Sequence, residues 1–132
     1  MKTYKQIREL VNEQVNQAAV IKGAEEYMKI GREKYKNHPT FKDLYARQKN
    51  DLDKSVGPKY IKIYNVEKGS RRSINCFIDK NTGDVLKPAS FNAPAKGARG
   101  NVLDRTYMTN LKRNYDTHGG HLYRQRIGRI FG

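Results

Sequence analysis

Residues 60–87 read YIKIYNVEKGSRRSINCFIDKNTGDVLK, and their apolar side chains recur at every second position in three short runs. A two-residue period is typical of β-strands, because successive side chains point to opposite faces of a sheet. Turn-forming residues separate the runs, and such short connections favour pairing between consecutive strands. We therefore predict a three-stranded antiparallel β-meander, with strands at residues 60–64, 73–78 and 85–87.

The alternation also assigns side chains to the two faces of this sheet. Ile61 and Ile63 fall on one face of the first strand, and Ile74, Cys76 and Ile78 fall together on one face of the second. These five side chains are the predicted apolar face of the meander.

The other face carries aromatic residues beside a cation. Tyr60 and Tyr64 flank Lys62, while Asn75 and Phe77 share a face of the next strand. If the two faces coincide, they form a platform on which single-stranded nucleic acid can stack. The alternative is that this face packs beneath N-terminal helices. We favour packing for Phe77, whereas both interpretations fit Tyr60 and Tyr64 equally well.

The chain before this region has a helical period, with apolar residues at the i, i+3, i+4, i+7 spacing of one helix face. Gly23 is expected to end a first helix, and a second is expected at residues 24–35. Pro39 then interrupts the pattern, because proline disfavours helical geometry at the preceding residue. A further helix is expected from residue 41 to about residue 53.

Helical spacing returns at residues 102–115, and the chain ends in a segment that alternates arginines with apolar residues. The predicted fold class is therefore α+β: N-terminal helices packed with a three-stranded antiparallel β-meander, then a C-terminal helix and a basic tail. We predict a helical arm or support at residues 1–57, a small α+β domain at residues 58–116 and a basic C-terminal tail at residues 117–132.

The run that follows the third predicted strand has neither period. Residues 87–101 read KPASFNAPAKGARGN, which combines three cations with small residues, two prolines and one aromatic. Small residues and positive charge allow the backbone to approach a polyanion closely. We expect this run to be a basic loop that contacts phosphate.

The net charge indicates the class of partner. The chain holds 27 lysines and arginines against 13 acidic residues, a net charge of +14. Residues 86–132 alone hold nine cations and two anions, a net charge of +7. A polyanionic partner would relieve this repulsion, and nucleic acid is the partner we predict. We expect no membrane partner, because no apolar run approaches the ~20 residues that a spanning helix needs.

The predicted nucleic-acid-binding residues are cations in four places: at a turn of the meander, in the basic loop, in the C-terminal helix and in the tail. They are Arg71, Arg72, Lys87, Lys96, Arg99, Lys112, Arg113, Arg124, Arg126 and Arg129. For any one of them, a solvated surface charge is an equally good interpretation, whereas the concentration of the set near the C-terminus favours binding.

We predict no catalytic residue, no cofactor and no metal. Cys76 is the only cysteine, so no intrachain disulfide is expected, and its apolar neighbours favour a buried thiol. His118 and His121 lack the further ligands of a zinc site and are better explained as a polar turn. A histidine-based nuclease would require Asp104 or Asp116 to meet His118 in space. The protein is therefore not expected to be an enzyme.

Three motifs carry a resemblance to a known group of proteins: FID at residues 77–79, TGDV at residues 82–85 and PAKGARGN at residues 94–101. The segment of residues 73–101 that contains them resembles a module of small, mostly uncharacterised tailed-bacteriophage proteins, which tend to carry an aromatic at the position of Phe91. This resemblance implies a phage origin and no catalytic residues. In element order alone, the sheet is similar to the arm-binding domains of phage integrases, whose sheet enters the major groove.

These observations favour a non-enzymatic, phage-encoded nucleic-acid-binding protein that acts in the host cytoplasm, with the N-terminal helices as a support or a dimerisation face. One alternative is a virion structural or assembly protein, because the segment RIGRIF at residues 126–131 ends the chain with apolar side chains. Another is an inhibitor of a host nucleic-acid-binding partner. DNA and RNA, single- and double-stranded, all remain open as ligands.

Overall fold

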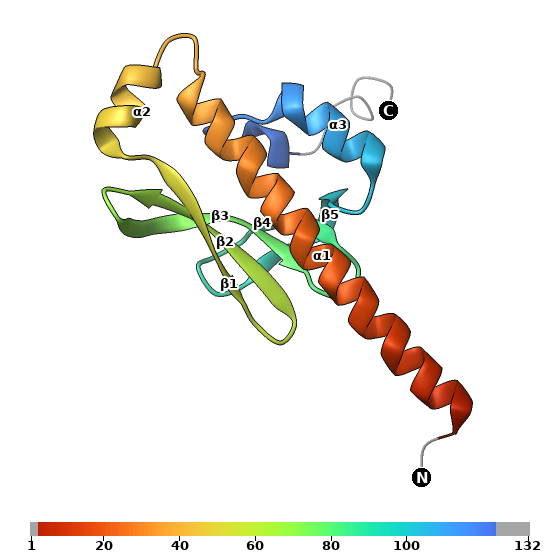
Figure 1. Cartoon of the computed structure of the whole chain (residues 1–132). Coiled ribbons are helices and arrows are strands. Elements are labelled where there is room, and N and C mark those ends of the chain that lie inside the picture. Colours follow the sequence, from red (N-terminus) through yellow and green to blue (C-terminus); the bar gives the residue numbers. More distant parts are fainter. Residues whose placement is uncertain (1–2, 124–132) are drawn as a thin grey trace, which may run out of the picture.

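The computed structural model describes the backbone of residues 3–123 and the side chains of residues 3–7 and 16–123. In chain order, the elements of Figure 1 are α1 (Tyr4–Lys36), α2 (Lys42–Gln48), β1 (Asp51–Val56), β2 (Tyr60–Glu67), β3 (Ser70–Asp79), β4 (Asp84–Pro88), β5 (Pro94–Asn101), α3 (Arg105–Asn114) and the short 3-10 helix η1 (Gly120–Leu122).

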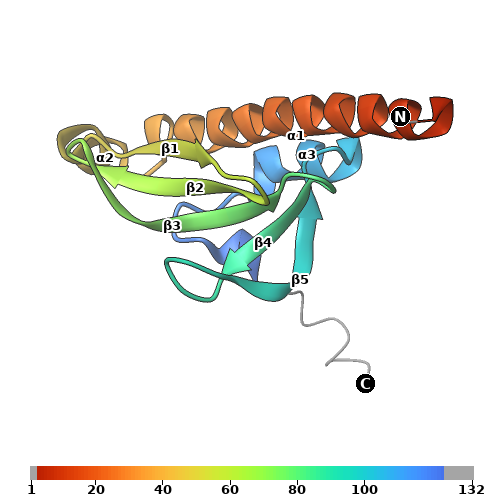
Figure 2. The same ribbon diagram turned by 90° about the horizontal axis from the view of Figure 1, so that it is seen from below.

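The five strands form one antiparallel sheet in the order β1-β2-β3-β4-β5. Figure 2 shows α1 lying along one face of this sheet, with α3 on the same side. We call this side the inner face and the opposite side the outer face. The predicted three-stranded meander is wrong: its strands correspond to β2, β3 and β4, and β1 and β5 add one strand at each edge. The C-terminal helix expected at residues 102–115 is present as α3.

The strand β1 replaces the second half of the helix expected at residues 41–53. The helix α2 ends at Gln48, and Lys49 follows in the left-handed conformation with φ of 52°. Leu52 then faces the inner core, with 1% of its surface exposed. The helical spacing of the apolar residues misled the prediction, because pairing with β2 across six residues outweighs local helical preference.

The strand β5 replaces the basic loop expected at residues 87–101. This run is a β-hairpin in which β4 and β5 are joined by a tight turn, with the amides of Ala89 and Ser90 each 3.0 Å from the carbonyl oxygen of Ala93. One of its small residues serves packing, since a Cβ on Gly100 would overlap the ring of Tyr107 from α3. Gly100 is therefore explained by contact within the protein, without a polyanion.

The helix α1 is continuous from Tyr4 to Lys36, so the expected break at Gly23 is wrong. Gly23 instead allows the helix to approach the end of β5, because a Cβ there would lie 2.7 Å from Cγ2 of Val102. Thr3 caps the start of the helix through a capping box with Gln6. Within residues 3–123, no helix has both the length and the apolar character needed to cross a membrane.

Two apolar clusters stabilise the sheet, one on each face. The main core lies on the inner face and joins α1, α3 and η1 to the sheet, through buried residues that extend from Val20 to Leu122. Ile61, Ile63 and Ile78 belong to this core, as their spacing predicted. A smaller cluster on the outer face is built around Tyr64, Ile74 and Phe77, with Tyr60, Val66 and Leu86 packed against it.

Ile74 belongs to the outer cluster because β3 contains a β-bulge. Ile63 pairs with Cys76 and Tyr64 pairs with Ile74, so Asn75 is an extra residue in β3. The predicted grouping of Ile74 with Cys76 on one face is therefore wrong. A strict two-residue alternation cannot locate such an insertion, since it shifts every side chain before it to the other face.

The bulge directs the side chain of Asn75 into a buried polar network on the inner side. Its carbonyl oxygen accepts a hydrogen bond from the hydroxyl of Tyr27 at 2.6 Å, and its amide donates to the hydroxyl of Tyr115 at 2.9 Å. The Tyr27 hydroxyl also contacts Nε2 of His121 at 2.7 Å. Because Nδ1 of His121 accepts from the backbone amide of Asp116, Nε2 carries the hydrogen and donates it to Tyr27.

Candidate nucleic-acid interface

The outer face of the sheet gathers aromatic rings from elements far apart in sequence. The rings of Tyr60 and Phe77 meet edge to face, with 5.7 Å between their centroids. Phe91, in the turn between β4 and β5, brings its ring to 5.9 Å from that of Tyr64. The hairpin therefore completes on this face a row of four rings that spans β2, β3 and the β4–β5 turn.

Cations lie over these rings. Nζ of Lys59 is 5.3 Å from the ring centroid of Tyr60, and Nζ of Lys62 is 5.7 Å from that of Phe77. Lys62 also lies 5.4 Å from the ring of Phe91 and donates a hydrogen bond to its carbonyl oxygen at 3.2 Å. We call this surface the aromatic–cation row: Tyr60, Tyr64, Phe77 and Phe91 with Lys59, Lys62 and Arg71.

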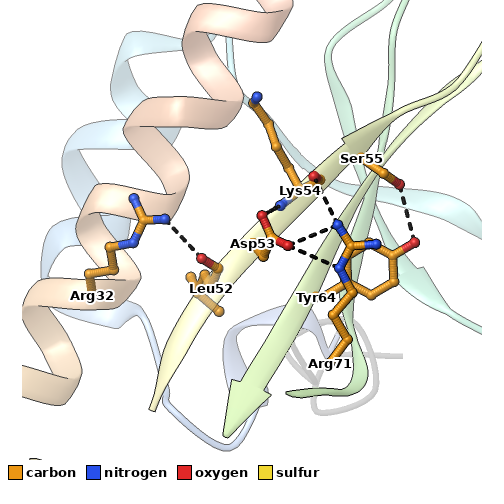
Figure 3. A network of polar contacts seen from close by, with 7 residues as sticks. All are labelled: Arg32, Leu52, Asp53, Lys54, Ser55, Tyr64 and Arg71. Atoms are coloured by element: carbon orange, nitrogen blue, oxygen red, sulfur yellow. Dashed lines mark hydrogen bonds and ion pairs between the residues drawn. The ribbon is translucent and has the colours of Figure 1, made fainter. Parts of the chain in front are cut away.

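Arg71 covers the fourth ring and links the row to β1 (Figure 3). Its guanidinium carbon is 4.1 Å from the ring centroid of Tyr64, whose hydroxyl lies 3.1 Å from Oγ of Ser55. Arg71 also donates to Oδ2 of Asp53 through Nε at 2.9 Å, and this bond lowers the pKa of the Asp53 carboxyl. Asp53 neutralises part of the charge of Arg71, but the two side chains are 52% and 44% exposed, so solvent reaches the pair.

The rings differ in how far a ligand can reach them. Phe91 is 52% exposed and Tyr60 is half-buried, whereas Tyr64 and Phe77 are buried. Packing of Phe77 was predicted, but it occurs within the outer cluster and not beneath helices, since α1 covers the opposite face. Sequence reasoning gave Phe91 no stacking role, although the aromatic residue amid small ones in the run 87–101 was a signal for it.

The structure places Lys87, Lys112 and Arg113 away from this row. Lys112 and Arg113 lie in the last turn of α3, on the inner side of the sheet. Lys87 in β4 places Nζ 4.0 Å from the ring centroid of Tyr123, beside η1. Arg72 and Lys96 are exposed.

Arg99 is half-buried beside α3, away from the outer cluster. The remaining predicted residues, Arg124, Arg126 and Arg129, lie outside the described residues. Of the seven predicted cations that lie within the described residues, Arg71 is the one that the structure places over a ring of this row, that of Tyr64.

The candidates for other chemistry have structural roles. Burial raises the pKa of the Cys76 thiol to about 12, so the thiol stays protonated and unreactive. The Asp116 carboxylate accepts from the backbone amide of His118 at 2.9 Å. Burial lowers the pKa of His121 to about 4, which keeps its ring neutral. In the part of the chain that the structure describes, no three histidine, cysteine, aspartate or glutamate side chains are grouped to hold a metal.

Comparison with known proteins assigns a family to this fold. No curated protein and no solved structure matches the chain. A family model does match it, over residues 2–124, and its description is "Family of unknown function (DUF7717)". The match takes in every helix and strand described above. Because the family model matches most of the length of the chain, the chain belongs to the family DUF7717, a family of unknown function.

Proposed function

We propose that this protein binds nucleic acid through the aromatic–cation row on the outer face of its sheet. The observation that carries the proposal is the placement of cations over aromatic rings on the sheet face that α1 leaves uncovered. A surface of this kind offers bases a ring to stack on and offers phosphates a positive charge beside each stack. The net charge of +14 adds long-range attraction for a polyanion.

The two kinds of side chain would have different tasks. Phe91 and Tyr60 are the accessible rings, so they would stack on bases, while Tyr64 and Phe77 support them from below. Lys59, Lys62 and Arg71 would contact phosphates. Stacking needs unpaired bases, so single-stranded nucleic acid is the ligand that this row fits best.

The protein would act by binding alone, without catalysis. The resemblance of residues 73–101 to tailed-phage proteins extends the proposal to a phage-encoded protein that acts in the cytoplasm of an infected host. Phe91 stands at the position where those phage proteins tend to carry an aromatic residue. It is also the most exposed ring of the row, which makes it the first residue to test.

The test is a titration of labelled single-stranded DNA, single-stranded RNA and duplex DNA, followed by fluorescence anisotropy at several salt concentrations. Phe91→Ala should weaken single-strand binding by about 1–3 kcal/mol, the usual contribution of one base–ring stack. Phe41→Ala is the matched control, because Phe41 is 43% exposed but packs on His38 near α2. Equal losses in the two variants, or affinity that salt does not change, would contradict the proposal.

A charge variant tests the phosphate contacts separately. Lys62→Gln should reduce the dependence of log K on log salt by about 0.7, the slope for one phosphate of a single strand. Lys42→Gln, which removes an exposed lysine of α2, should leave the slope unchanged.

A second candidate function is assembly with other proteins, which the length of α1 favours. Asn16 and Gln17 of the helix form side-chain hydrogen bonds with Asn81 in the turn between β3 and β4. The 12 residues before Asn16 extend about 18 Å, and Figure 1 shows this end of α1 projecting from the sheet. Mass spectrometry of purified phage particles tests this role: many copies per particle support assembly, and absence supports a role inside the cell.

A further inference from the structure

The strand β1 forms one edge of the sheet, and its backbone runs straight along that edge. It pairs with β2 over all six of its residues without a register shift. The hairpin that joins the two strands closes with a hydrogen bond from the amide of Gly57 to the carbonyl oxygen of Tyr60. Because hydrogen-bonded pairs alternate along an antiparallel ladder, Leu52, Lys54 and Val56 direct their amides and carbonyl oxygens away from β2.

The opposite edge of the sheet, β5, is less regular. Gly97 lies in this strand with φ of 93°. The register of β5 against β4 also shifts between Ala98 and Gly100, which leaves Arg99 as the extra residue of a β-bulge. Bulges of this kind prevent edge strands from pairing with a further strand. The edge that offers a continuous ladder is therefore β1.

Side-chain hydrogen bonds occupy both outward backbone groups of Leu52. Its amide donates to Oδ1 of Asp51 at 2.7 Å. Its carbonyl oxygen accepts from Nη2 of Arg32 at 2.8 Å (Figure 3). Nε of Arg32 also donates to Oδ1 of Asp51 at 2.6 Å. One guanidinium, which comes from α1, therefore joins the carboxylate of Asp51 to the carbonyl oxygen of the next residue.

The same arrangement recurs two residues later, at Lys54 (Figure 3). Its amide donates to Oδ1 of Asp53 at 2.8 Å, and Nη2 of Arg71 lies 3.5 Å from its carbonyl oxygen. Arg71 comes from β3 and donates to Oδ2 of Asp53 as well. The repeat has the two-residue period of the outward backbone groups, which indicates that it serves the edge. We call these four side chains the edge-capping network: Arg32, Asp51, Asp53 and Arg71.

The side chain of Lys54 adds a further obstacle to pairing at this edge. It extends to the inner side of the sheet, where its Nζ is 3.0 Å from Oε1 of Glu25 in α1. Inward-pointing charges on an edge strand discourage pairing, because a second strand has to cover them. Edge strands without such features are templates for pairing with another chain.

We propose that the edge-capping network keeps β1 closed to strand pairing, and that the strand it excludes is β1 of a second copy of this chain. Two copies of β1 can pair antiparallel about a two-fold axis at Lys54. This register places Leu52 opposite Val56 and gives every outward residue a partner. The bulged β5 offers no comparable ladder.

The experiment compares two double variants in protein that has been freed of nucleic acid by nuclease treatment. Asp51→Ala with Asp53→Ala removes both carboxylates that accept from the outward amides. Asp51→Asn with Asp53→Asn removes the same charges but keeps a side-chain oxygen that can accept from each amide. Analytical ultracentrifugation measures self-association. We expect the dimer dissociation constant of the alanine variant to be at least tenfold lower than that of the asparagine variant or the wild type.

Hydrogen exchange of the backbone amides identifies the surface that associates. In the alanine variant, the amides of Leu52 and Lys54 should exchange rapidly at low protein concentration. They should exchange at least tenfold more slowly at concentrations where the variant is dimeric, because the second copy of β1 then accepts from them. Circular dichroism verifies that the variant keeps its fold.

A single variant tests the other half of the network and serves if the alanine variant does not fold. Arg32→Ala removes the donor to the carbonyl oxygen of Leu52 and should also promote self-association, to a smaller extent. Arg47→Ala is the matched control, because it removes an exposed arginine of α2 and should sediment like the wild type.

Three results would overturn the proposal. The first is unchanged self-association in both the alanine variant and Arg32→Ala. The second is an equal gain in the alanine and asparagine variants, which would assign the effect to charge. The third is self-association without slower exchange at Leu52 and Lys54, which would place the interface elsewhere. Because all these measurements exclude nucleic acid, they are independent of the function proposed for the aromatic–cation row.

Discussion

His121 donates a hydrogen bond from Nε2 to the hydroxyl of Tyr27 at 2.7 Å and thereby ties the segment after α3 to the middle of α1. The ring of His121 also stacks on that of Tyr115, with 4.2 Å between centroids. The Tyr27 hydroxyl in turn donates a hydrogen bond to the side-chain carbonyl oxygen of Asn75 in β3. These two hydrogen bonds join α1, the bulge of β3 and the segment after α3.

The free energy of unfolding should depend on pH through His121. Burial lowers the pKa of this residue to about 4 in the folded protein, against about 6.5 in an unfolded chain. The unfolded state therefore binds the proton more readily, and the stabilisation is complete above about pH 6.5 and is lost as the pH falls towards about 4. We expect a loss of about 2–3 kcal/mol over this range, measured by urea denaturation.

His121→Gln provides the control, because glutamine does not titrate. The variant should be less stable at neutral pH but should show a smaller decline on acidification. Identical pH profiles for the variant and the wild type would contradict the role of His121.

Tyr27→Phe should destabilise the protein by about 2 kcal/mol. The substitution preserves the ring but leaves the carbonyl oxygen of Asn75 and Nε2 of His121 without their partner, and unpaired buried groups cost about 1–3 kcal/mol. Chemical denaturation measures the difference. Tyr4→Phe serves as the control, since Tyr4 is 81% exposed and should tolerate the change.

Gly100→Ala should destabilise the protein by about 1–3 kcal/mol, because the added methyl group overlaps the ring of Tyr107. Ala98→Ser, an exposed position two residues earlier, should unfold at the temperature of the wild type. Unchanged stability of Gly100→Ala would show that the ring does not pack on β5.

Asp53→Asn should change the free energy of unfolding by less than about 1 kcal/mol, even though it breaks the ion pair with Arg71. Both side chains are about half exposed, so water screens their attraction. The same variant should strengthen binding of nucleic acid, because it frees the full charge of Arg71. Weaker binding would contradict the phosphate role that we assign to Arg71.

The central strands and the apolar inner face, except for Ile74, were predictable from the sequence. Ile61 and Ile63 alternate with more polar neighbours, which places both side chains on the same face of the strand. The structure confirms that both are buried in the inner core. The edges were not predictable. In β1 only Leu52 is buried, and β5 consists largely of small and charged residues, so neither strand carries the apolar alternation that identifies a strand.

The candidate sites were predictable only in part. The excess of positive charge indicates a class of partner, but it does not indicate which cations share a face. Arg71 and Arg99 entered the predicted set for the same reason, yet they lie on opposite sides of the sheet. Their separation depends on pairing register and bulges, which local sequence patterns do not encode.

The hydrogen-bond network around Tyr27 also constrains when the core can form during synthesis of the chain. Its hydrogen-bond partners Asn75 and His121 lie 48 and 94 residues further along the sequence. During synthesis, α1 leaves the ribosome long before either partner exists, and contacts between distant residues form slowly. The buried face of the helix can therefore complete its polar contacts only after His121 has been translated.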